Sequence, residues 1–332
     1  MTRYYVGVDI GATNVRAGLF DEEGRMLRKI RRSFPTTGFE DFLKNLVLDL
    51  CGDVIKNVAR VGIGSIGPLD IARGSVFRTP NAPIKSFNLV SPMRELGLEV
   101  VIANDASAAA WGEYILGSGR GRENLLYITI STGIGGGVIV DSELLIGKDG
   151  NAHEIGHLVV DHSSSLRCGC GGYGHWEAIA SGSNMPRSFA NYVVSLNLCG
   201  KTGYRVSPLC SDLEKGKSPS PEEIFSMYYK GDPVASSYVE KYLVPVNAAG
   251  MASAINAYDP EILVLGGGIA LNNKEIFARG IERYLDRYLA VRKPEIVFTA
   301  FGDDVGLYGA ASLAMRIPRP LEKYVSIWNS KA

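Results

Sequence analysis

Two segments about 120 residues apart share one pattern of strand, turn and returning strand. The first runs from residue 4 to residue 20 and the second from residue 125 to residue 140. Each begins with an apolar run, passes through a short turn rich in glycine, serine or threonine, and returns in a second apolar run. Such turns expose backbone N–H groups that can contact an anion. Two copies predict a duplicated α/β fold with one anion-binding turn in each half.

The residues after each hairpin alternate between helical and extended patterns. Apolar residues recur at helical spacing in some segments, and short apolar runs bounded by glycine or proline predict strands in others. The first half is expected to contain strands at 60–67 and 100–103 and helices at 39–57 and 106–116. The second half is expected to contain helices at 245–258, 275–289 and 305–315 and strands at 261–265 and 295–300. Strand–turn–helix units of this kind predict ligands at the carboxyl ends of the strands.

We therefore predict an α/β protein of two domains with a cleft between them. Residues 1–115 form the smaller domain, which a helix at 305–317 completes, and residues 116–304 form the larger one. An irregular insertion at about 191–233, rich in glycine, serine, lysine and proline, interrupts the second domain. The role of this insertion does not follow from its residues.

A cysteine and histidine group lies in the second half, with the spacing H-x10-C-x-C-x4-H. It consists of His157, Cys168, Cys170 and His175. Four ligands of these types complete a closed tetrahedral zinc site and leave no position for a catalytic water. Glu154 and Glu177 flank the group and are not needed to fill it. We predict a structural zinc loop at 154–177 whose two flanking acids bind a polar ligand.

Residues 153–157 also match H-E-x-x-H, the zinc helix of metalloproteases. Gly156 inside the motif and the β-branched pair Val159 and Val160 after it argue against a helix. The nearby cysteines offer His157 other partners, so His153 is interpreted as a loop residue. A zinc metalloprotease is kept as an alternative class.

The two hairpin turns and a glycine run are candidates for nucleotide binding. Asp9 could hold Mg²⁺ through water, while the N–H groups of the first turn contact phosphates. A plain hairpin turn with an aspartate cap is the structural alternative, and the second turn makes the functional reading stronger. A glycine run that follows a strand would let a flat base lie on the backbone. The candidates are Asp9, Gly11, Ala12, Thr13 and Asn14, then Thr132 and Gly133, then Gly266, Gly267 and Gly268.

Asn104 and Asp105 end an apolar strand and begin an alanine-rich helix. Asparagine and aspartate are favoured helix caps, which stabilise a helix by about 1 kcal/mol. A second interpretation makes Asp105 a general base that accepts a hydroxyl proton. Both can hold, because capping fixes the side chain where a base must stand.

Charge and cysteine content exclude several classes. Lysine plus arginine number 35 and aspartate plus glutamate number 35, so no basic excess argues for nucleic acid or an anionic membrane. No apolar run approaches the ~20 residues of a membrane span, and no signal-peptide pattern is present. We therefore expect a cytoplasmic protein without a disulfide framework. A bridge between Cys199 and Cys210 remains open.

These motifs together resemble the ROK family (repressor, open reading frame, kinase) of sugar kinases. The resemblance covers the chain from Val6 to about Gly309 and rests on E-x-G-H at 154–157 and C-x-C-G-x-x-G-x-x-E at 168–177. The family usually has a third cysteine where this chain has His175, and histidine is an equally good zinc ligand. The resemblance implies two ribonuclease H-like domains of the actin-like ATPase superfamily. Since no DNA-binding segment precedes Tyr4, the repressor branch is not expected.

The resemblance also implies an activity and residue roles. The activity is ATP- and Mg²⁺-dependent transfer of phosphate to the 6-hydroxyl of glucose or a related hexose. N-acetylmannosamine or N-acetylglucosamine kinase and a non-catalytic sugar-binding regulator are the alternatives. The implied general base is Asp105, and the implied sugar-binding residues are Gly67, Asn81, Asn104, Asp105, Glu154, His157 and Glu177. A homodimer or homotetramer is expected, and the range of phosphate donors stays open.

Overall fold

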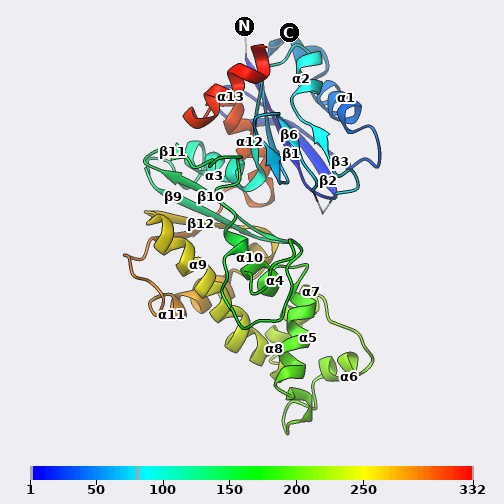
Figure 1. The fold of residues 1–332 in the computed structure, drawn as a ribbon, viewed down its shortest axis with the longest axis vertical. Coiled ribbons are helices and arrows are strands. Elements are labelled where there is room, and N and C mark those ends of the chain that lie inside the picture. The colour runs from blue at the N-terminus through cyan, green and yellow to red at the C-terminus, as the bar shows by residue number, and fades with distance from the viewer. Residues whose placement is uncertain (1–2, 80–81, 331–332) are drawn as a thin grey trace.

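The computed structural model describes residues 3–79 and 82–330 (Figure 1). Two five-stranded sheets dominate it. The first contains β1 (Tyr4–Ile10), β2 (Asn14–Phe20), β3 (Met26–Ser33), β4 (Val58–Ser65) and β8 (Val100–Asn104), in the order β3-β2-β1-β4-β8. The second contains β9 (Leu125–Ile130), β10 (Ile134–Val140), β11 (Glu143–Leu144), β12 (Ile262–Gly266) and β13 (Glu295–Phe298), in the order β11-β10-β9-β12-β13. A small third sheet contains β5 (Leu69–Asp70), β6 (Ser75–Val76) and β7 (Phe87–Asn88).

The two large sheets have the same topology. In each, three antiparallel strands are followed by two strands added in parallel beside the first, so β1 corresponds to β9, β4 to β12 and β8 to β13. This repetition confirms the duplicated α/β fold expected from the two hairpin patterns. The central parallel strands end at the same edge of their sheet, which is where parallel α/β sheets place ligands.

The helices fall into two groups. Those from residues 39–115 and 302–330 are α1 (Phe39–Cys51) with the 3₁₀ segment η1 (Gly52–Asn57), α2 (Ser91–Glu95), α3 (Asp105–Ile115), which packs against both large sheets, η6 (Gly302–Asp304), α12 (Val305–Met315) and α13 (Arg319–Ser330). The others are η2 (Ile155–His157), α4 (Trp176–Ala180), α5 (Met185–Ser195), η3 (Leu198–Gly200), α6 (Pro208–Glu214), α7 (Pro221–Tyr229), α8 (Pro233–Tyr238), η4 (Val239–Leu243), α9 (Val244–Tyr258), α10 (Gly268–Asn272), η5 (Ile276–Gly280) and α11 (Ile281–Leu285). No helix within residues 3–79 and 82–330 combines the length and apolar character needed to span a bilayer.

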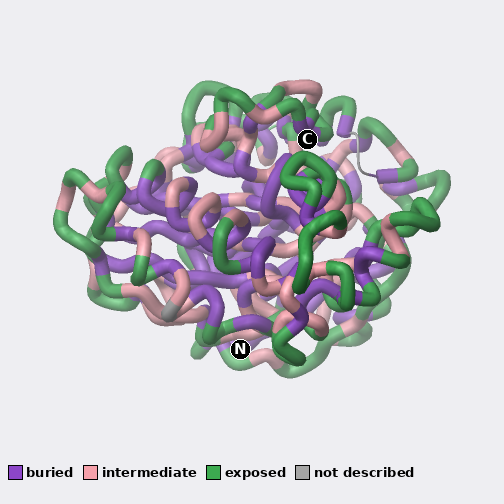
Figure 2. The backbone as a smooth tube through the Cα atoms, turned by 90° about the horizontal axis from the view of Figure 1, so that it is seen from below, coloured by how far each residue is buried: buried purple, intermediate pink, exposed green. Residues whose placement is uncertain are grey.

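Two large apolar clusters form the core, and the second sheet lies between them. Side chains on β9 alternate, with Leu125 and Tyr127 in one cluster and Leu126 and Ile128 in the other. This is the two-residue period of a strand that is buried on both faces. The tube in Figure 2 shows buried segments inside and mostly exposed segments around them. The two halves are therefore joined by apolar packing.

Helix α12 packs so closely on the first sheet and on α3 that backbone atoms are in contact without side chains between them. An added Cβ at Gly7 or Gly62 would overlap carbonyl oxygens of α12, and one at Gly309 would overlap the carbonyl of Ala108 in α3. Glycine is needed at these positions because no side chain fits between the two backbones. Helix α12 therefore packs directly on the first sheet. The division into two domains at residue 115, with the C-terminal helix completing the first, stays a proposal.

Some element boundaries differ from the sequence-based expectations. The helix expected at 39–57 changes to a 3₁₀ segment at Gly52, whose φ of 53° ends the α-helix. The helix expected at 275–289 is a π-turn followed by the five-residue α11. The helix expected to reach residue 317 ends at Met315, shortly before Pro318, which disfavours helix in the residue before it. Helix α13 was not expected.

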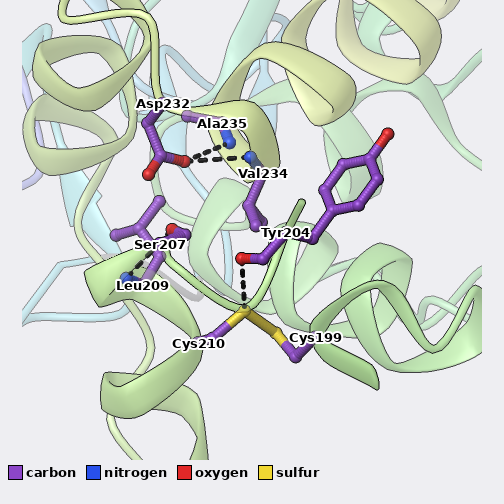
Figure 3. The surroundings of a disulfide bond; sticks show 8 residues. All are labelled: Cys199, Tyr204, Ser207, Leu209, Cys210, Asp232, Val234 and Ala235. Atoms are coloured by element: carbon purple, nitrogen blue, oxygen red, sulfur yellow. Dashed lines mark hydrogen bonds between the residues drawn. A yellow bond between two sulfur atoms is a disulfide. The ribbon is translucent and has the colours of Figure 1, made fainter. Parts of the chain in front are cut away.

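The insertion at about 191–233 is helical and contains a disulfide. Cys199 and Cys210 are joined, with their Cα atoms 5.6 Å apart, so the bridge that stayed open from sequence is formed (Figure 3). Ser207 accepts a hydrogen bond from the N–H of Leu209 at the start of α6. Asp232 accepts hydrogen bonds from the first turn of α8. Caps and a covalent bridge therefore add to the apolar packing by which this segment joins the second core cluster.

We expect the double substitution Cys199→Ala and Cys210→Ala to lower the free energy of unfolding by about 3 kcal/mol. The bridge closes a loop with a sequence separation of 11, and closing such a loop reduces the entropy of the unfolded chain. Denaturant unfolding of both proteins without reductant measures the difference. Reductant should leave the double variant unchanged. Equal unfolding midpoints for the two proteins would contradict the prediction.

Candidate functional site

The first hairpin turn places Asp9 at the carboxyl edge of the first sheet. Asp9 is the penultimate residue of β1, and Arg16 of β2 donates from Nε to its Oδ2 at 2.9 Å. The turn is closed by the N–H of Gly11, which donates to the carbonyl of Asn14 at 3.0 Å. None of residues 11–14, the Ala12 and Thr13 candidates included, is buried. The turn can therefore meet a ligand, with a carboxylate held beside it.

The second hairpin turn has an equivalent place in the second sheet. The N–H of Ser131 donates to the carbonyl of Gly133 at 2.9 Å. Ser183, from the loop before α5, donates its hydroxyl to the carbonyl of Thr132 at 2.7 Å. Glu177 of α4 accepts a hydrogen bond from the N–H of Ile134 at 3.0 Å. Hydrogen bonds thus join the turn both to α4, through Glu177, and to the loop before α5, through Ser183.

The glycine run at 266–268 forms the turn between β12 and α10. Gly267 has φ 87°, and a Cβ there would clash with the carbonyl of Ile130 in β9. A Cβ on Gly266 would clash with the hydroxyl of Tyr127. Gly268 differs, because nothing lies within 4 Å of its Cβ position. The first two glycines are required by packing, and the third leaves open space over the backbone that a flat ligand group could occupy.

Asn104 and Asp105 stand where β8 meets α3. The Asn104 Oδ1 caps the helix by accepting from the N–H groups of Ala106 at 2.9 Å and Ser107 at 3.4 Å. Asp105 Oδ1 also accepts from the Ala106 N–H, at 2.8 Å. The expected cap is therefore formed by Asn104, which fixes the direction of the aspartate beside it.

The pKa of Asp105 is raised to about 7, first by burial of the carboxyl group and then by the negative charges of Asp9 and Glu154. The hydrogen bond from Ala106 opposes this rise. These charges show that Asp105, Asp9 and Glu154, which are far apart in sequence, share one electrostatic environment. A carboxyl group with a pKa near neutrality can accept a proton and later release it.

The cysteine and histidine group is brought together by the loop between β11 and α4. The ligand atoms of His157, Cys168, Cys170 and His175 all lie within 4.8 Å of one another. Cys168 Sγ is 3.7 Å from His157 Nδ1, and Cys170 Sγ is 3.3 Å from His175 Nδ1. Tetrahedral Zn²⁺ with Zn–S near 2.3 Å and Zn–N near 2.0 Å requires ligand atoms about 3.3–3.8 Å apart. These two distances and the residue types fit a tetrahedral zinc site.

Two details of the loop favour a metal. Burial and the neighbouring His157 lower the pKa of His175, which keeps its imidazole in the neutral form that binds metals. A Cβ on Gly172 would clash with the His175 ring, so only glycine lets the loop fold under that ligand. That the four residues hold zinc remains a proposal.

The two ring nitrogens of His157 have different neighbours. Its Nδ1 is turned to Cys168, and its Nε2 lies 3.5 Å from Glu154 Oε2. His153 is buried and points elsewhere, with Nε2 3.2 Å from the carbonyl of Gly150. Within the motif only Ile155–His157 are helical, as the three-residue 3₁₀ segment η2, and they do not form a protease helix. H-E-x-x-H is therefore not a metalloprotease motif in this fold.

Two sugar-site candidates lie near an asparagine that sequence reasoning missed. The Cβ position of Gly67 is 3.7 Å from Asn104 Nδ2 and 3.8 Å from Asn151 Oδ1. Asn151, from the loop after β11, also contacts both backbone groups of Leu69, at 3.5 and 3.4 Å. Asn151 thus connects the second half of the chain to the first beside Gly67. No motif marked it in the sequence, because the contact joins residues 82 apart.

Asn81, the remaining sugar-site candidate, lies outside the described residues. Both carboxylate oxygens of Glu177 have partners within the protein. Its Oε2 accepts a hydrogen bond from the N–H of Ile134, and Cys168 Sγ is 3.5 Å from its Oε1. It connects the cysteine and histidine group to the second hairpin turn. Its expected role toward a sugar hydroxyl remains a proposal.

Two sheets of equal topology, each with a turn at the carboxyl edge of its central strand, define the actin-like ATPase fold class. A model of the ROK family matches residues 5–317. The chain belongs to the ROK family.

Three relatives illustrate the similarity. A glucokinase of Pyrobaculum calidifontis is 42% identical over 96% of this chain and 98% of its own length. A ROK hexokinase structure from Thermus thermophilus superposes with a TM-score of 0.78 at 32% identity, covering 94% of this chain and 97% of that one. A ROK family glucokinase from Streptomyces griseus, solved with glucose and AMPPNP, superposes with a TM-score of 0.73 at 33% identity, covering 94% of this chain and 99% of that one.

Proposed function

We propose that this protein transfers the γ-phosphate of ATP to the 6-hydroxyl of glucose, with Asp105 as the general base. The coarser statement, that the chain is an ATP-dependent sugar kinase, follows from its family and from glucokinases that match it over nearly their whole length. The observation that carries the finer proposal is the position of Asp105. Its carboxyl group stands at the head of α3, has a pKa near 7, and feels the charges of Asp9 and Glu154.

Each part of the site has a role in phosphoryl transfer, which depends mostly on positioning and on a base. The two hairpin turns offer backbone N–H groups to the phosphates, and the open face at Gly268 accepts the base of the nucleotide. Mg²⁺, held through water by Asp9, would supply positive charge to the phosphate oxygens. Asp105 takes the proton of the 6-hydroxyl as its oxygen attacks phosphorus.

The sugar is positioned by polar groups from both halves of the chain. Gly67 and Asn104 come from the first half, and Glu154 and His157 from the second. A sugar presents several donor hydroxyls, which suit carboxylate and amide oxygens. Zinc at the cysteine and histidine group would fix the ring of His157, so that Nε2 and Glu154 keep their direction toward the sugar.

The proposal is tested by ADP release from Mg-ATP with glucose, mannose, fructose, glucosamine, N-acetylglucosamine and N-acetylmannosamine. Glucose should give the highest kcat/KM, and an Asp105→Ala variant should release no sugar-dependent ADP. Faster turnover of an N-acetylated sugar would reassign the substrate to the hexosamine class. Absence of turnover with every sugar, although glucose binds in calorimetry, would favour a sugar-binding regulator.

The pH dependence of the reaction provides an independent check on the base. A carboxylate base works in its ionised form, and burial raises the pKa of Asp105 to about 7. We therefore expect kcat/KM for the sugar to fall about tenfold per pH unit below pH 7 and to level off above it. Initial rates from pH 5.5 to 8.5, with thermal stability followed over the same range, measure the profile. A flat profile down to pH 5.5 in a folded enzyme would contradict the assignment.

A further inference from the structure

A polar pocket of about 300 Å³ lies beside the cysteine and histidine group, and its two arginines have no role in the proposed transfer site. It is lined by Arg167, Cys168, Gly169, Gly171, Asn184 and Arg187. Its walls come from two elements, the loop at 167–171 and the first residues of the 11-residue helix α5. Cys168 belongs to the cysteine and histidine group, but the proposed transfer of phosphate uses neither Arg167, Asn184 nor Arg187.

Both guanidinium groups in this pocket carry positive charge that the protein does not neutralise. Arg187 donates to the carbonyl of Arg167 and, at 3.2 Å, to Asn184 Oδ1. Arg167 donates from Nε to the carbonyl of Gly171 at 3.4 Å. Across the described part of the chain these partners are all neutral oxygens, and neither arginine pairs with a carboxylate. Each guanidinium has five N–H donors, so several are left for a ligand.

The surroundings add to this positive potential. Asn184 is the N-cap residue of α5, and the amino end of a helix carries partial positive charge. Zinc bound by two thiolates and two neutral imidazoles would be neutral overall, so the metal site would not cancel the arginines. Two guanidinium groups facing one pocket at a helix start match the planar, multidentate recognition of phosphate oxygens.

The pocket is also connected to the second hairpin turn. Ser183, next to Asn184, donates its hydroxyl to the carbonyl of Thr132 in that turn. An anion beside Asn184 would thus lie next to the residue, Ser183, whose hydrogen bond holds the proposed phosphate-binding turn.

We propose that this pocket is a second phosphate-binding site, in which Arg167 and Arg187 hold a phosphate-type oxyanion. The bound anion would bridge the two arginines and fasten the loop at 167–171 to α5. Its source is either free inorganic phosphate or the phosphate chain of the donor. The site does not depend on the proposed function, because binding of phosphate requires no turnover.

Calorimetric titration of the zinc-loaded protein with inorganic phosphate, at constant ionic strength, tests the proposal. The variants are Arg167→Gln, Arg187→Gln and the charge-retaining Arg187→Lys. Arg205→Gln is the matched control, since Arg205 is exposed and does not line the pocket. Each glutamine variant should bind phosphate roughly tenfold more weakly, because a charge-assisted, bidentate contact is lost. Arg187→Lys should lose less, and the control should match the wild type.

A second titration in saturating AMPPNP separates the two sources. Loss of phosphate binding would identify the pocket with the phosphate chain of the donor, and unchanged binding would identify a site for free phosphate. Arg187 also contacts the loop through the carbonyl of Arg167, so Arg187→Gln could destabilise the fold. The Arg167 side chain donates within its own loop, so Arg167→Gln still tests the proposal if Arg187→Gln does not fold. The proposal is overturned if the glutamine variants bind phosphate as the wild type does, or if the wild type binds none at about 10 mM.

Discussion

Replacing Asp105 with asparagine should lower kcat by about 10²–10⁴-fold, the contribution typical of a general base. Asparagine has nearly the same size, and its side-chain oxygen can still accept the hydrogen bond from Ala106. It cannot accept a proton from the sugar hydroxyl at neutral pH. The KM values for sugar and ATP should change much less than kcat, because the geometry of the site is kept. Steady-state kinetics with glucose and Mg-ATP measure the three constants.

The matched control is Asp53→Asn, which removes an exposed carboxylate from η1. Asp53 is not one of the proposed site residues. It should leave kcat unchanged. The substitution at Asp105 should also remove the fall in rate below pH 7, since the titrating group is gone. If Asp105→Asn keeps more than a tenth of the wild-type kcat, another group is the base.

The second large effect concerns the cysteine and histidine group. We expect His175→Ala to lose bound zinc and to lower kcat/KM for glucose by roughly 100-fold or more. Even the replacement of a residue that hydrogen-bonds to a metal ligand typically lowers metal affinity or activity by about 10–100-fold. Without the metal, the loop at 154–177 would lose the link that directs His157 and Glu154. Metal content by atomic emission, thermal unfolding and kinetics with glucose measure the three consequences.

His175→Cys provides the control, because it restores the ligand that most of the family carries at this position. A cysteine there should keep one zinc per chain and most of the activity. If His175→Ala retains both zinc and activity, the four residues are not the metal site. If it loses zinc but keeps the sugar KM, the metal stabilises the loop without directing the sugar ligands.

The features that could be predicted from sequence are those set by local pattern. The hairpins at 4–20 and 125–140 were visible because strand alternation and turn residues are local, and their repetition implied the duplicated sheets. Asn104 was predicted as a helix cap from its position between a strand and an alanine-rich helix, and it caps α3. The cysteine and histidine spacing predicted which side chains gather, although their binding of zinc remains a prediction.

The features that could not be predicted depend on contacts between distant segments. Asn151 contacts Leu69 across 82 residues, and no periodicity encodes that meeting. The pKa of Asp105 depends on Asp9 and Glu154, which only the fold brings near. Arg167 and Arg187 are both exposed, and only the fold of the loop against the start of α5 shows that they line one open pocket. Helix α13 was not expected, and its contact with the first half of the chain, in which Trp328 donates to the carbonyl of Ile71, joins residues 257 apart.

The close packing of α12 on the first sheet has a consequence for synthesis of the chain on the ribosome. The strands of that sheet are complete at Asn104, yet the helix that covers them begins about 200 residues later, at Val305. At ~5–20 residues per second, this interval lasts about 10–40 s. During that time the backbone at Gly7 and Gly62, which α12 covers in the folded protein, is without that cover. The second sheet, whose strands and helices are nearly all made in between, therefore has the opportunity to fold before the first.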